Sequence, residues 1–247
     1  MRKFSHHIII TLGLLAIWQG IVWIGDLPEY ILPSPLQVFK ALCLQYQVIA
    51  IQSLPTLLEI FIGFILGILF GCLAALIIAY FHPLKRWFLP ILIISQAIPT
   101  FAIAPLLVIW FGYGMTSKIA TTVLMIFFPV ASAFHDGLAR TYSGWLDLAN
   151  TMNAKKWRVF CYIRIPAALP SLASGIRIAA VIAPIGAIIG EWVGSSRGLG
   201  YLMLNANARM QIDVMFAVIA VVVLLSLAFY FSINRLLHKL IWWEISI

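Results

Sequence analysis

The polar residues that could do chemistry gather in one segment, residues 147–166, which lies between two long hydrophobic runs. Three basic side chains, Lys155, Lys156 and Arg158, follow closely after Asn153. The pattern predicts two short helices that meet at Asn153, because Asn is second only to Gly in entering the left-handed backbone region where helices end. Short helices beside a basic loop favour a docking surface for another molecule. An ordinary amphipathic hairpin at a membrane interface is the alternative interpretation.

Catalytic and metal-binding patterns do not stand out elsewhere. Asp136 beside His135 is better explained as a solvated helix end than as a catalytic pair. Cys43, Cys72 and Cys161 are scattered and lack CxxC spacing, which predicts small apolar filler rather than disulfides or a zinc site. The His residues show no HExxH spacing, and the sequence has no GxxxxGK(S/T) loop to cradle nucleotide phosphates. We therefore expect neither an enzyme nor a metal or cofactor site on this chain.

The composition identifies the class of protein. With 63% hydrophobic residues, 10% charged residues and a mean hydropathy of +1.04, the chain is a membrane protein rather than a soluble domain. A helix needs about 20 apolar residues to cross a bilayer. The hydrophobic runs predict an all-α membrane protein with six transmembrane helices in a single domain, residues 1–247. The predicted spans are residues 8–24, 54–81, 88–111, 118–135, 169–190 and 214–236. The first run lacks an Ala-x-Ala-like cleavage site after it, so we expect a retained helix rather than a signal peptide.

The Lys and Arg residues predict the orientation. With the N-terminus inside, eleven of them lie in inner segments and four in outer segments, and cytoplasmic loops are the ones enriched in Lys and Arg. We therefore expect both termini in the cytoplasm. The net charge of +8 follows from this asymmetry, and nucleic acid is not needed to explain it. The inner residues are Arg2, Lys3, Lys85, Arg86, Arg140, Lys155, Lys156, Arg158, Arg164, Arg235 and Lys239, and the outer ones are Lys40, Lys118, Arg197 and Arg209.

Small residues recur at every fourth position in two of the predicted spans. Such stripes let helix backbones approach closely in lipid, where burial of apolar surface gives no net drive for helices to associate. Static helix packing is the favoured interpretation, and an interface that slides during function is the alternative. The stripes are Gly63, Gly67, Gly71, Ala75 and Ala79 in the second span, and Gly175, Ala179, Ala183 and Ala187 in the fifth span, where the stripe ends at Glu191.

A few polar residues and prolines in the spans are candidates for a functional path. Gln96 and Pro99 lie in the third span, where irregular backbone must face protein or water, so we expect both near a translocation path. Bonding of Gln96 to a neighbouring helix is the alternative. A carboxylate within a membrane span is a candidate functional group, and Glu59 is one. It nevertheless lies close enough to the end of its span to reach the interface. We expect Glu191 to gate the path or contact a partner, with a solvated loop carboxylate as the alternative.

The polar segment also resembles a known family. Its residues follow the pattern Glu-Ala-Ala, three residues, Gly, nine residues, Ile, one residue, Leu-Pro, which resembles the cytoplasmic coupling loop of permease subunits of binding-protein-dependent ABC importers. The matching positions are Asp147, Ala149, Asn153, Ile163, Ile165 and Pro166. Asp147 replaces the usual Glu and keeps its charge, and Asn153 replaces the usual Gly. Residues 32–35 (LPSP), 95–118 and 194–203 resemble other regions of the branch that transports nitrate, sulfonates, taurine and thiamine pyrimidine precursors.

The resemblance implies a type I ABC importer permease fold with a cytoplasmic coupling helix in residues 140–167. It makes Asp147 a polar contact or a helix-start charge, Asn153 a hinge, and Pro166 the stop that directs the chain into the fifth span. The implied partners are an ATP-binding subunit that holds ATP and Mg, an extracytoplasmic substrate-binding protein, membrane lipid and a second permease copy in a bacterial plasma membrane. The expected solute is a thiamine pyrimidine precursor, followed by an aliphatic sulfonate or taurine.

Two other classes of protein remain as alternatives. An ion-coupled secondary transporter or channel predicts several ionisable residues at mid-membrane and an inverted repeat. In this sequence Glu59 and Arg177 are the only candidates for such groups, both near span ends, and no repeat stands out. An intramembrane enzyme is the second alternative, and the sequence offers it no catalytic constellation.

Overall fold

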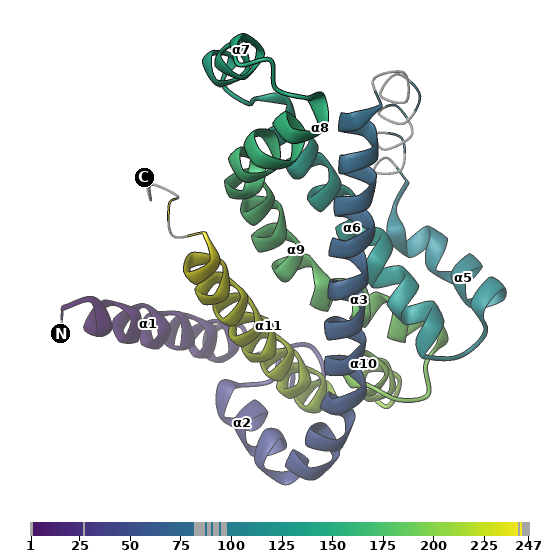
Figure 1. Ribbon diagram of the computed structural model, residues 1–247. Coiled ribbons are helices and arrows are strands. Elements are labelled where there is room, and N and C mark those ends of the chain that lie inside the picture. The colour runs from purple at the N-terminus through teal and green to yellow at the C-terminus, as the bar shows by residue number, and fades with distance from the viewer. Residues whose placement is uncertain are drawn as a thin grey trace.

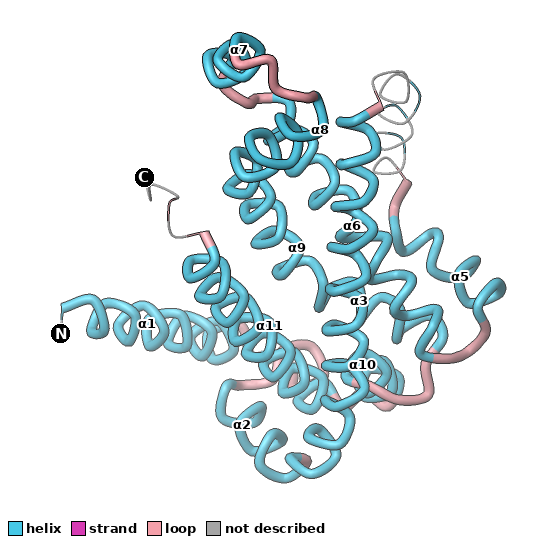
Figure 2. Tube along the Cα trace, viewed as in Figure 1, coloured by secondary structure: helices cyan, strands magenta, loops and turns pink. Residues whose placement is uncertain are grey.

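The computed structural model describes residues 2–26, 28–81, 98–241 and the isolated positions 87, 90, 94 and 243; of residues 2–9 and 11 it describes only the backbone. Helices joined by short loops make up this part of the chain (Figure 1), and Figure 2 shows no strand in it. The elements are α1 (Arg2–Ile24), α2 (Pro35–Leu44), α3 (Tyr46–Tyr80), α5 (Thr100–Phe111), α6 (Met115–Ala139), α7 (Ser143–Thr151), α8 (Lys156–Val159), the π-helical turn η1 (Phe160–Arg164), α9 (Ile165–Gly194), α10 (Leu199–Ala208) and α11 (Ile212–Leu240).

Four helices in the described part of the chain are long and apolar enough to cross a membrane. They are Tyr46–Tyr80, Met115–Ala139, Lys156–Gly194 and Ile212–Leu240, and the second, fourth, fifth and sixth predicted spans fall on them. Each helix is longer than the span predicted for it. The second one begins eight residues earlier than the sequence indicated, because Pro55 lies inside α3 instead of at its first turn.

The first predicted span falls on a helix that lies apart from the four long ones, and the third is described only in part. Residues 8–24 lie in α1, which projects away from the other helices (Figure 1) and is held near its base by Trp18, whose ring N–H donates to the Pro33 carbonyl at 3.1 Å. Within α1, the fully described stretch Leu12–Ile24 is an apolar helix. Of residues 88–111, the structure describes chiefly the second half, which forms α5.

α6 lies between α3 and α9, and the glycines of both neighbours face it. A Cβ added at Gly67 would lie 2.3 Å from Ile126 of α6, and one at Gly175 would lie 2.7 Å from Ala133 of α6. Gly63 and Gly186 approach opposite sides of one α6 residue, Thr122. Since only a hydrogen fits at these positions, the three helix backbones approach closely enough for van der Waals packing to hold them together in lipid.

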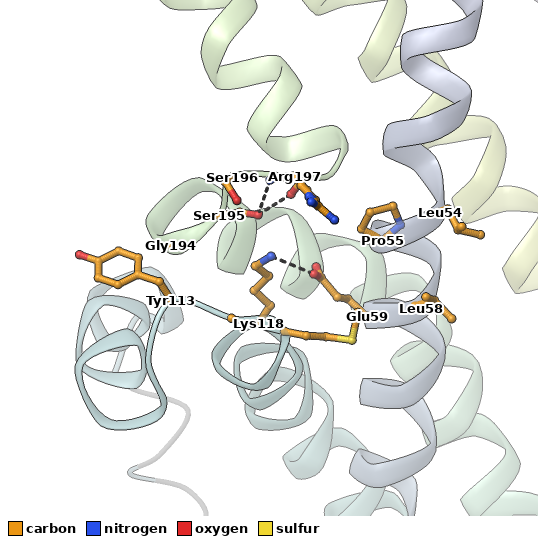
Figure 3. Close-up of a pocket in the computed structure, with 12 residues that line it drawn as sticks. Leu54, Pro55, Leu58, Glu59, Tyr113, Lys118, Gly194, Ser195, Ser196 and Arg197 are labelled. Carbon is orange, nitrogen blue, oxygen red and sulfur yellow. Dashed lines mark hydrogen bonds and ion pairs between the residues drawn. The ribbon is translucent and has the colours of Figure 1, made fainter.

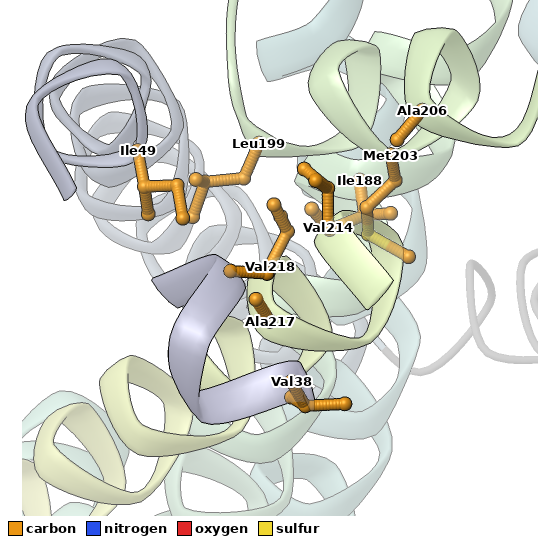
Figure 4. Packing of buried hydrophobic residues seen from close by; sticks show 10 residues of the cluster. Val38, Ile49, Ile188, Leu199, Met203, Ala206, Val214, Ala217 and Val218 are labelled. Atoms are coloured by element: carbon orange, nitrogen blue, oxygen red, sulfur yellow. The ribbon is translucent and has the colours of Figure 1, made fainter. Parts of the chain in front are cut away.

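The bundle has two distinct ends. Figure 1 shows α7 and α8 at one end, called here the α7 end, and α2 and α10 at the other, called the α10 end. α2 begins with Ser34 as N-cap and Pro35 at the first helical position, both residue types that favour a helix start, and the Gln37 side chain completes a capping box. An apolar cluster anchors α10 and α2 against the long helices (Figure 4). Its buried members are Val38, Ala41, Ile49, Ile188, Leu199, Met203, Ala206, Val214, Ala217 and Val218.

Candidate functional site

α7 is the first of the two short helices in the polar segment. Ala149 is buried, whereas Trp145, Leu148 and Asp147 are exposed. Asp147 is the fifth residue of α7, so the prediction that it starts a helix is wrong. The apolar residues Trp145, Leu148, Ala149 and Met152 follow the helical period, which explains why the helix begins upstream of Asp147. Asp147 is therefore available at the surface for a polar contact.

Asn153 ends α7 in the left-handed conformation that the sequence predicts, with φ of +54°. The Asn153 N–H donates to the Asn150 carbonyl at 2.9 Å, and the Ala154 N–H donates to the Ala149 carbonyl at 2.9 Å. This pair of bonds is the Schellman motif, which satisfies carbonyls that a helix end leaves without partners. The chain turns there by a fixed local geometry and not by a disordered loop.

Pro166 does not stop the second short helix, contrary to the prediction. α8, η1 and α9 follow each other without a break, and the helical run Lys156–Gly194 has 39 residues. Pro166 lacks an N–H, and the turn before it widens into η1, where the Ile165 N–H donates to the Phe160 carbonyl. The π-helical turn accommodates Pro166 without ending the helix, so the polar segment continues directly into a long apolar helix.

Two contacts attach this helical run to the rest of the bundle at the α7 end. The Arg164 guanidinium donates from Nη2 to the Leu138 carbonyl at 2.9 Å, which satisfies an orphan carbonyl in the last turn of α6. The buried Phe160 ring packs edge-on against Tyr80 at the end of α3, with ring centroids 5.4 Å apart. The start of the helical run is thereby attached to the ends of α3 and α6.

A groove of about 890 Å³ lies between α7 and the start of α9. Four of the residues singled out from the sequence line it, namely Ala149, Asn153, Ile163 and Pro166, whereas Asp147 and Ile165 do not. The remaining lining residues include the exposed apolar side chains Trp145, Leu148, Met152 and Tyr162 and the basic side chains Lys155 and Arg158. An apolar groove rimmed by basic groups is suited to receive a segment of another protein.

A second polar site lies toward the α10 end, inside the bundle. Glu59 of α3 is 0% exposed and pairs with Lys118 of α6, whose Nζ lies 3.1 Å from Glu59 Oε1. The expectation that Glu59 reaches the interface is therefore wrong. Lys118, which the sequence assigns to the outer segments, lies in the first turn of α6 and is only 7% exposed. The ion pair offsets part of the cost of burying both charges away from water.

Glu191 of α9 lies beside this pair and is also 0% exposed, which excludes a solvated loop carboxylate. The Thr56 hydroxyl donates to Glu191 Oε1 at 2.6 Å, and the Gly200 N–H donates to Glu191 Oε2. The carboxylate thus accepts bonds from α3 on one side and from the start of α10 on the other.

A cavity of about 510 Å³ opens next to the ion pair (Figure 3). Its walls come from the first half of α3, the α5–α6 turn and the loop after α9, and the polar groups in it include Glu59, Lys118, Ser196 and Arg197. The volume is in the range of small-molecule sites in proteins. Within the described residues, no group of three or more His, Cys, Asp or Glu could hold a metal ion.

Of the three residues expected on a translocation path, Gln96 lies outside the described residues. Pro99 is an exposed residue at the start of α5 that does not line the cavity. Glu191 lies in the buried polar site beside Glu59 and Lys118. Arg177, the other charged residue expected within a span, donates from Nε to Asn234 of α11 at 3.0 Å.

Sequence reasoning missed three residues that bond at this site. Thr56 bonds to Glu191, Lys118 pairs with Glu59, and the Gln52 side-chain oxygen accepts from the Gly198 N–H. One signal could have shown that the two acids are buried: Glu59 precedes Gly63 by four residues, and Glu191 follows Ala187 by four residues. Both carboxylates therefore lie on the small-residue stripes that pack against other helices. A charge on a packing stripe predicts a buried partner, and Lys118 is that partner for Glu59.

Comparison with known proteins places this arrangement in a family. Residues 63–242 match the family described as "Binding-protein-dependent transport system inner membrane component". A "Probable ABC transporter permease protein" of Haemophilus influenzae is 55% identical over 93% of this chain and 94% of its own length. The formylaminopyrimidine transport permease protein ThiX of Halalkalibacterium halodurans is 37% identical over 94% of this chain and 93% of its own length.

The fold is shared with a solved importer. A chain of the MetNI methionine ABC transporter, in an inward-facing conformation, superposes with a TM-score of 0.64 at 20% identity, over 75% of this chain and 92% of that one. Its helical architecture agrees with the bundle described above. Together with the family match over most of the sequence, these findings show that the chain belongs to the inner membrane components of binding-protein-dependent transport systems, the permease subunits of ABC importers.

Proposed function

We propose that this permease subunit imports a thiamine pyrimidine precursor of the formylaminopyrimidine class. The observation that carries the proposal is the 37% identity to a formylaminopyrimidine permease across 94% of the chain. An aliphatic sulfonate or taurine is the second candidate, on the resemblance of the LPSP turn, residues 32–35, to that branch. ATP hydrolysis belongs to a partner subunit, as it does throughout this family of permeases.

We infer that the groove at the α7 end receives the ATP-binding subunit. Exposed Met152 and Leu148 supply apolar contact area, and exposed Asp147, Lys155 and Arg158 supply charges that orient the partner. The concentration of Lys and Arg near this end supports its placement in the cytoplasm. In this arrangement six spans cross the membrane, and two permease copies enclose the path between them.

The continuous helix from α8 to α9 supplies the mechanical link. Its 39 residues extend over roughly 55–60 Å at about 1.5 Å per residue. One end begins just beyond Asn153, and the other end carries Glu191 near the cavity. Closure of the ATP-binding subunits would push on the α7 end, and a rigid helix delivers that displacement to the α10 end, as alternating access requires.

Transport into vesicles tests the proposal. The permease is reconstituted with its ATP-binding subunit and its substrate-binding protein, and uptake of labelled formylaminopyrimidine is measured with and without ATP, beside taurine at the same concentration. We expect ATP-dependent uptake of formylaminopyrimidine and little of taurine. Uptake driven by an ion gradient without ATP would favour a secondary transporter, and ATP-dependent uptake of taurine alone would replace the solute while leaving the import function intact.

A further inference from the structure

We propose that Glu191 is a positioning residue that fixes the start of α10 and with it the loop between α9 and α10, residues 195–198, and thereby sets the wall of the cavity at the α10 end. The inference deepens the proposed import function, because this loop is one side of the cavity (Figure 3). Its basis is a set of three hydrogen bonds that reach the start of α10 from other helices.

Three consecutive backbone N–H groups at the start of α10 are satisfied by side chains. The Gly198 N–H donates to Gln52 Oε1 at 2.7 Å, the Leu199 N–H donates to Thr56 Oγ1 at 2.8 Å, and the Gly200 N–H donates to Glu191 Oε2. A helix leaves its first N–H groups without internal acceptors, and an N-cap side chain normally supplies one of them from within the same segment. Here the acceptors come from α3 and α9, so the same bonds that cap α10 also attach it to the bundle.

Glu191 is the charged member of this set. A carboxylate is stabilised near the start of a helix because the helix dipole is positive there. The Thr56 hydroxyl connects the set, since its oxygen accepts from the Leu199 N–H and its proton is donated to Glu191 Oε1. Removing the charge of Glu191 therefore weakens its own bond to α10 and the bond made through Thr56.

The glycines show how closely the loop approaches the carboxylate. Gly198 has φ of +111°, and a Cβ there would lie 2.1 Å from Glu191 Oε1. A Cβ at Gly200 would lie 2.9 Å from Glu191 Oε2. Backbone and carboxylate are thus in direct contact with no side chain between them. A methyl group at either glycine would displace the loop while leaving the acid intact.

Beside the bonds that hold the loop, the ion pair between Glu59 and Lys118 joins α6 to α3 and α9. Glu59 lies one turn after Thr56 in α3, and its partner Lys118 belongs to α6 and packs against Gly190 of α9. The loop is consequently fixed to α3 and α9, next to the point where α6 joins them. Displacement of α9 relative to α3 has to stretch the bonds at Glu191 or Thr56, which moves the cavity wall. The position of the loop is therefore coupled to the helix that receives the push from the ATP-binding subunit.

The test follows the loop directly in the complete importer. A spin label is attached through Ser196→Cys, a position exposed at the cavity rim, in a background where Cys43, Cys72 and Cys161 are alanine. With Glu191→Gln we expect the label to become mobile and ATP hydrolysis stimulated by the binding protein to fall by about tenfold or more, the factor that loss of a hydrogen bond to a charged group produces. Glu191→Asp keeps the carboxylate and should recover part of both signals.

Further variants separate positioning from loss of folding. Gly198→Ala should mobilise the same label although Glu191 is intact, and Gln52→Leu, which removes one bond at the part-buried edge, should give a smaller effect. Asp213→Asn removes the same charge at the start of α11 and should leave label mobility and stimulated hydrolysis at wild-type values. An immobile label in both Glu191→Gln and Gly198→Ala, or a mobile label with unchanged stimulated hydrolysis, would overturn the inference. An error in the solute would show differently, as absent formylaminopyrimidine uptake by the unaltered importer with its label immobile.

Discussion

The acidic side chains of this permease occur in two distinct environments, exposed and buried, which amino-acid composition alone does not distinguish. Asp147 is an acid at the surface of a short helix, whereas Glu59 and Glu191 are acids with no exposure at all. A surface carboxylate contributes through the partner that it meets, while a buried one must have its partner within the fold. The consequences of replacing them should therefore differ in kind.

Asp147→Lys should weaken docking without harming the bundle. Reversal of an exposed charge changes folding stability by less than about 0.5 kcal/mol, but it places a repulsive charge at a protein interface. We expect less ATP-binding subunit to co-purify and stimulated ATP hydrolysis to drop severalfold, with an unchanged melting temperature. Asp213→Lys, at the α10 end, is the control. Normal co-purification together with normal hydrolysis in Asp147→Lys would remove Asp147 from the docking surface.

Lys118→Met should destabilise the bundle, because it leaves Glu59 buried without its cation. Breaking a buried ion pair from one side costs about 3–5 kcal/mol. Thermal unfolding in detergent measures the effect, and the double variant Glu59→Leu with Lys118→Met should regain most of the loss because neither charge remains. A double variant as unstable as the single one would mean that Lys118 stabilises the fold through another contact.

At the scale of elements, glycines set how closely α3 and α9 approach α6. Their closest approaches are backbone to side chain, as at Gly67 against Ile126. The exposed large apolar residues of α3 and α11, such as Phe61 and Leu224, point instead to the surroundings of the bundle. Lipid solvates such residues as well as protein does, which is why shape complementarity decides the arrangement of helices.

Gly67→Ala is the sharpest test of this packing. The new methyl group would lie 2.3 Å from Ile126 Cγ1, so α3 or α6 must shift. Overpacking of this kind costs about 1–3 kcal/mol, and Ile126→Val in the same chain should recover part of it by making room. Gly20→Ala in α1 is the matched control, since nothing lies within 4 Å of a Cβ there. Equal melting temperatures for the Gly67 and Gly20 variants would contradict close packing at Gly67.

For the whole molecule, the two candidate sites lie at opposite ends, joined by one helix. The groove beside α7 and the cavity beside α10 are both lined by residues of, or directly adjoining, the run Lys156–Gly194. An importer needs such a separation, because its energy source and its solute meet the membrane protein from opposite sides. The orientation of the bundle in the membrane is therefore the decisive global property.

Labelling of intact cells tests that orientation. In a background where Cys43, Cys72 and Cys161 are alanine, Met152→Cys lies at the α7 end and Tyr113→Cys at the cavity rim, and both residues are exposed. We expect a membrane-impermeant maleimide to label the variant at position 113 in intact cells and the variant at position 152 only after the cells are opened. Labelling of position 152 from outside would reverse the topology and remove the docking assignment.

Local features of the fold could be predicted from the sequence. The break at Asn153 and the cap at Ser34 depend on residues within one turn of each position, so nearby sequence contains the information. Pro166 shows the limit of this reasoning. A proline predicts the loss of a bond, but whether the helix stops or widens into a π-helical turn depends on the packing of Phe160 and Arg164 against α3 and α6.

By itself the sequence determined that this chain is a helical membrane protein with a polar segment between two of its hydrophobic runs, because hydropathy and backbone preference are properties of neighbouring residues. The resemblance of that segment to a coupling loop then indicated a permease. Only the tertiary structure decided which charges meet. Glu59 and Lys118 are far apart along the chain, as are Thr56 and Glu191, and their pairing required α3, α6 and α9 to pack through their glycines. The physical reason is that a buried charge is acceptable only where the fold supplies its partner, and that partner is chosen by distance in space.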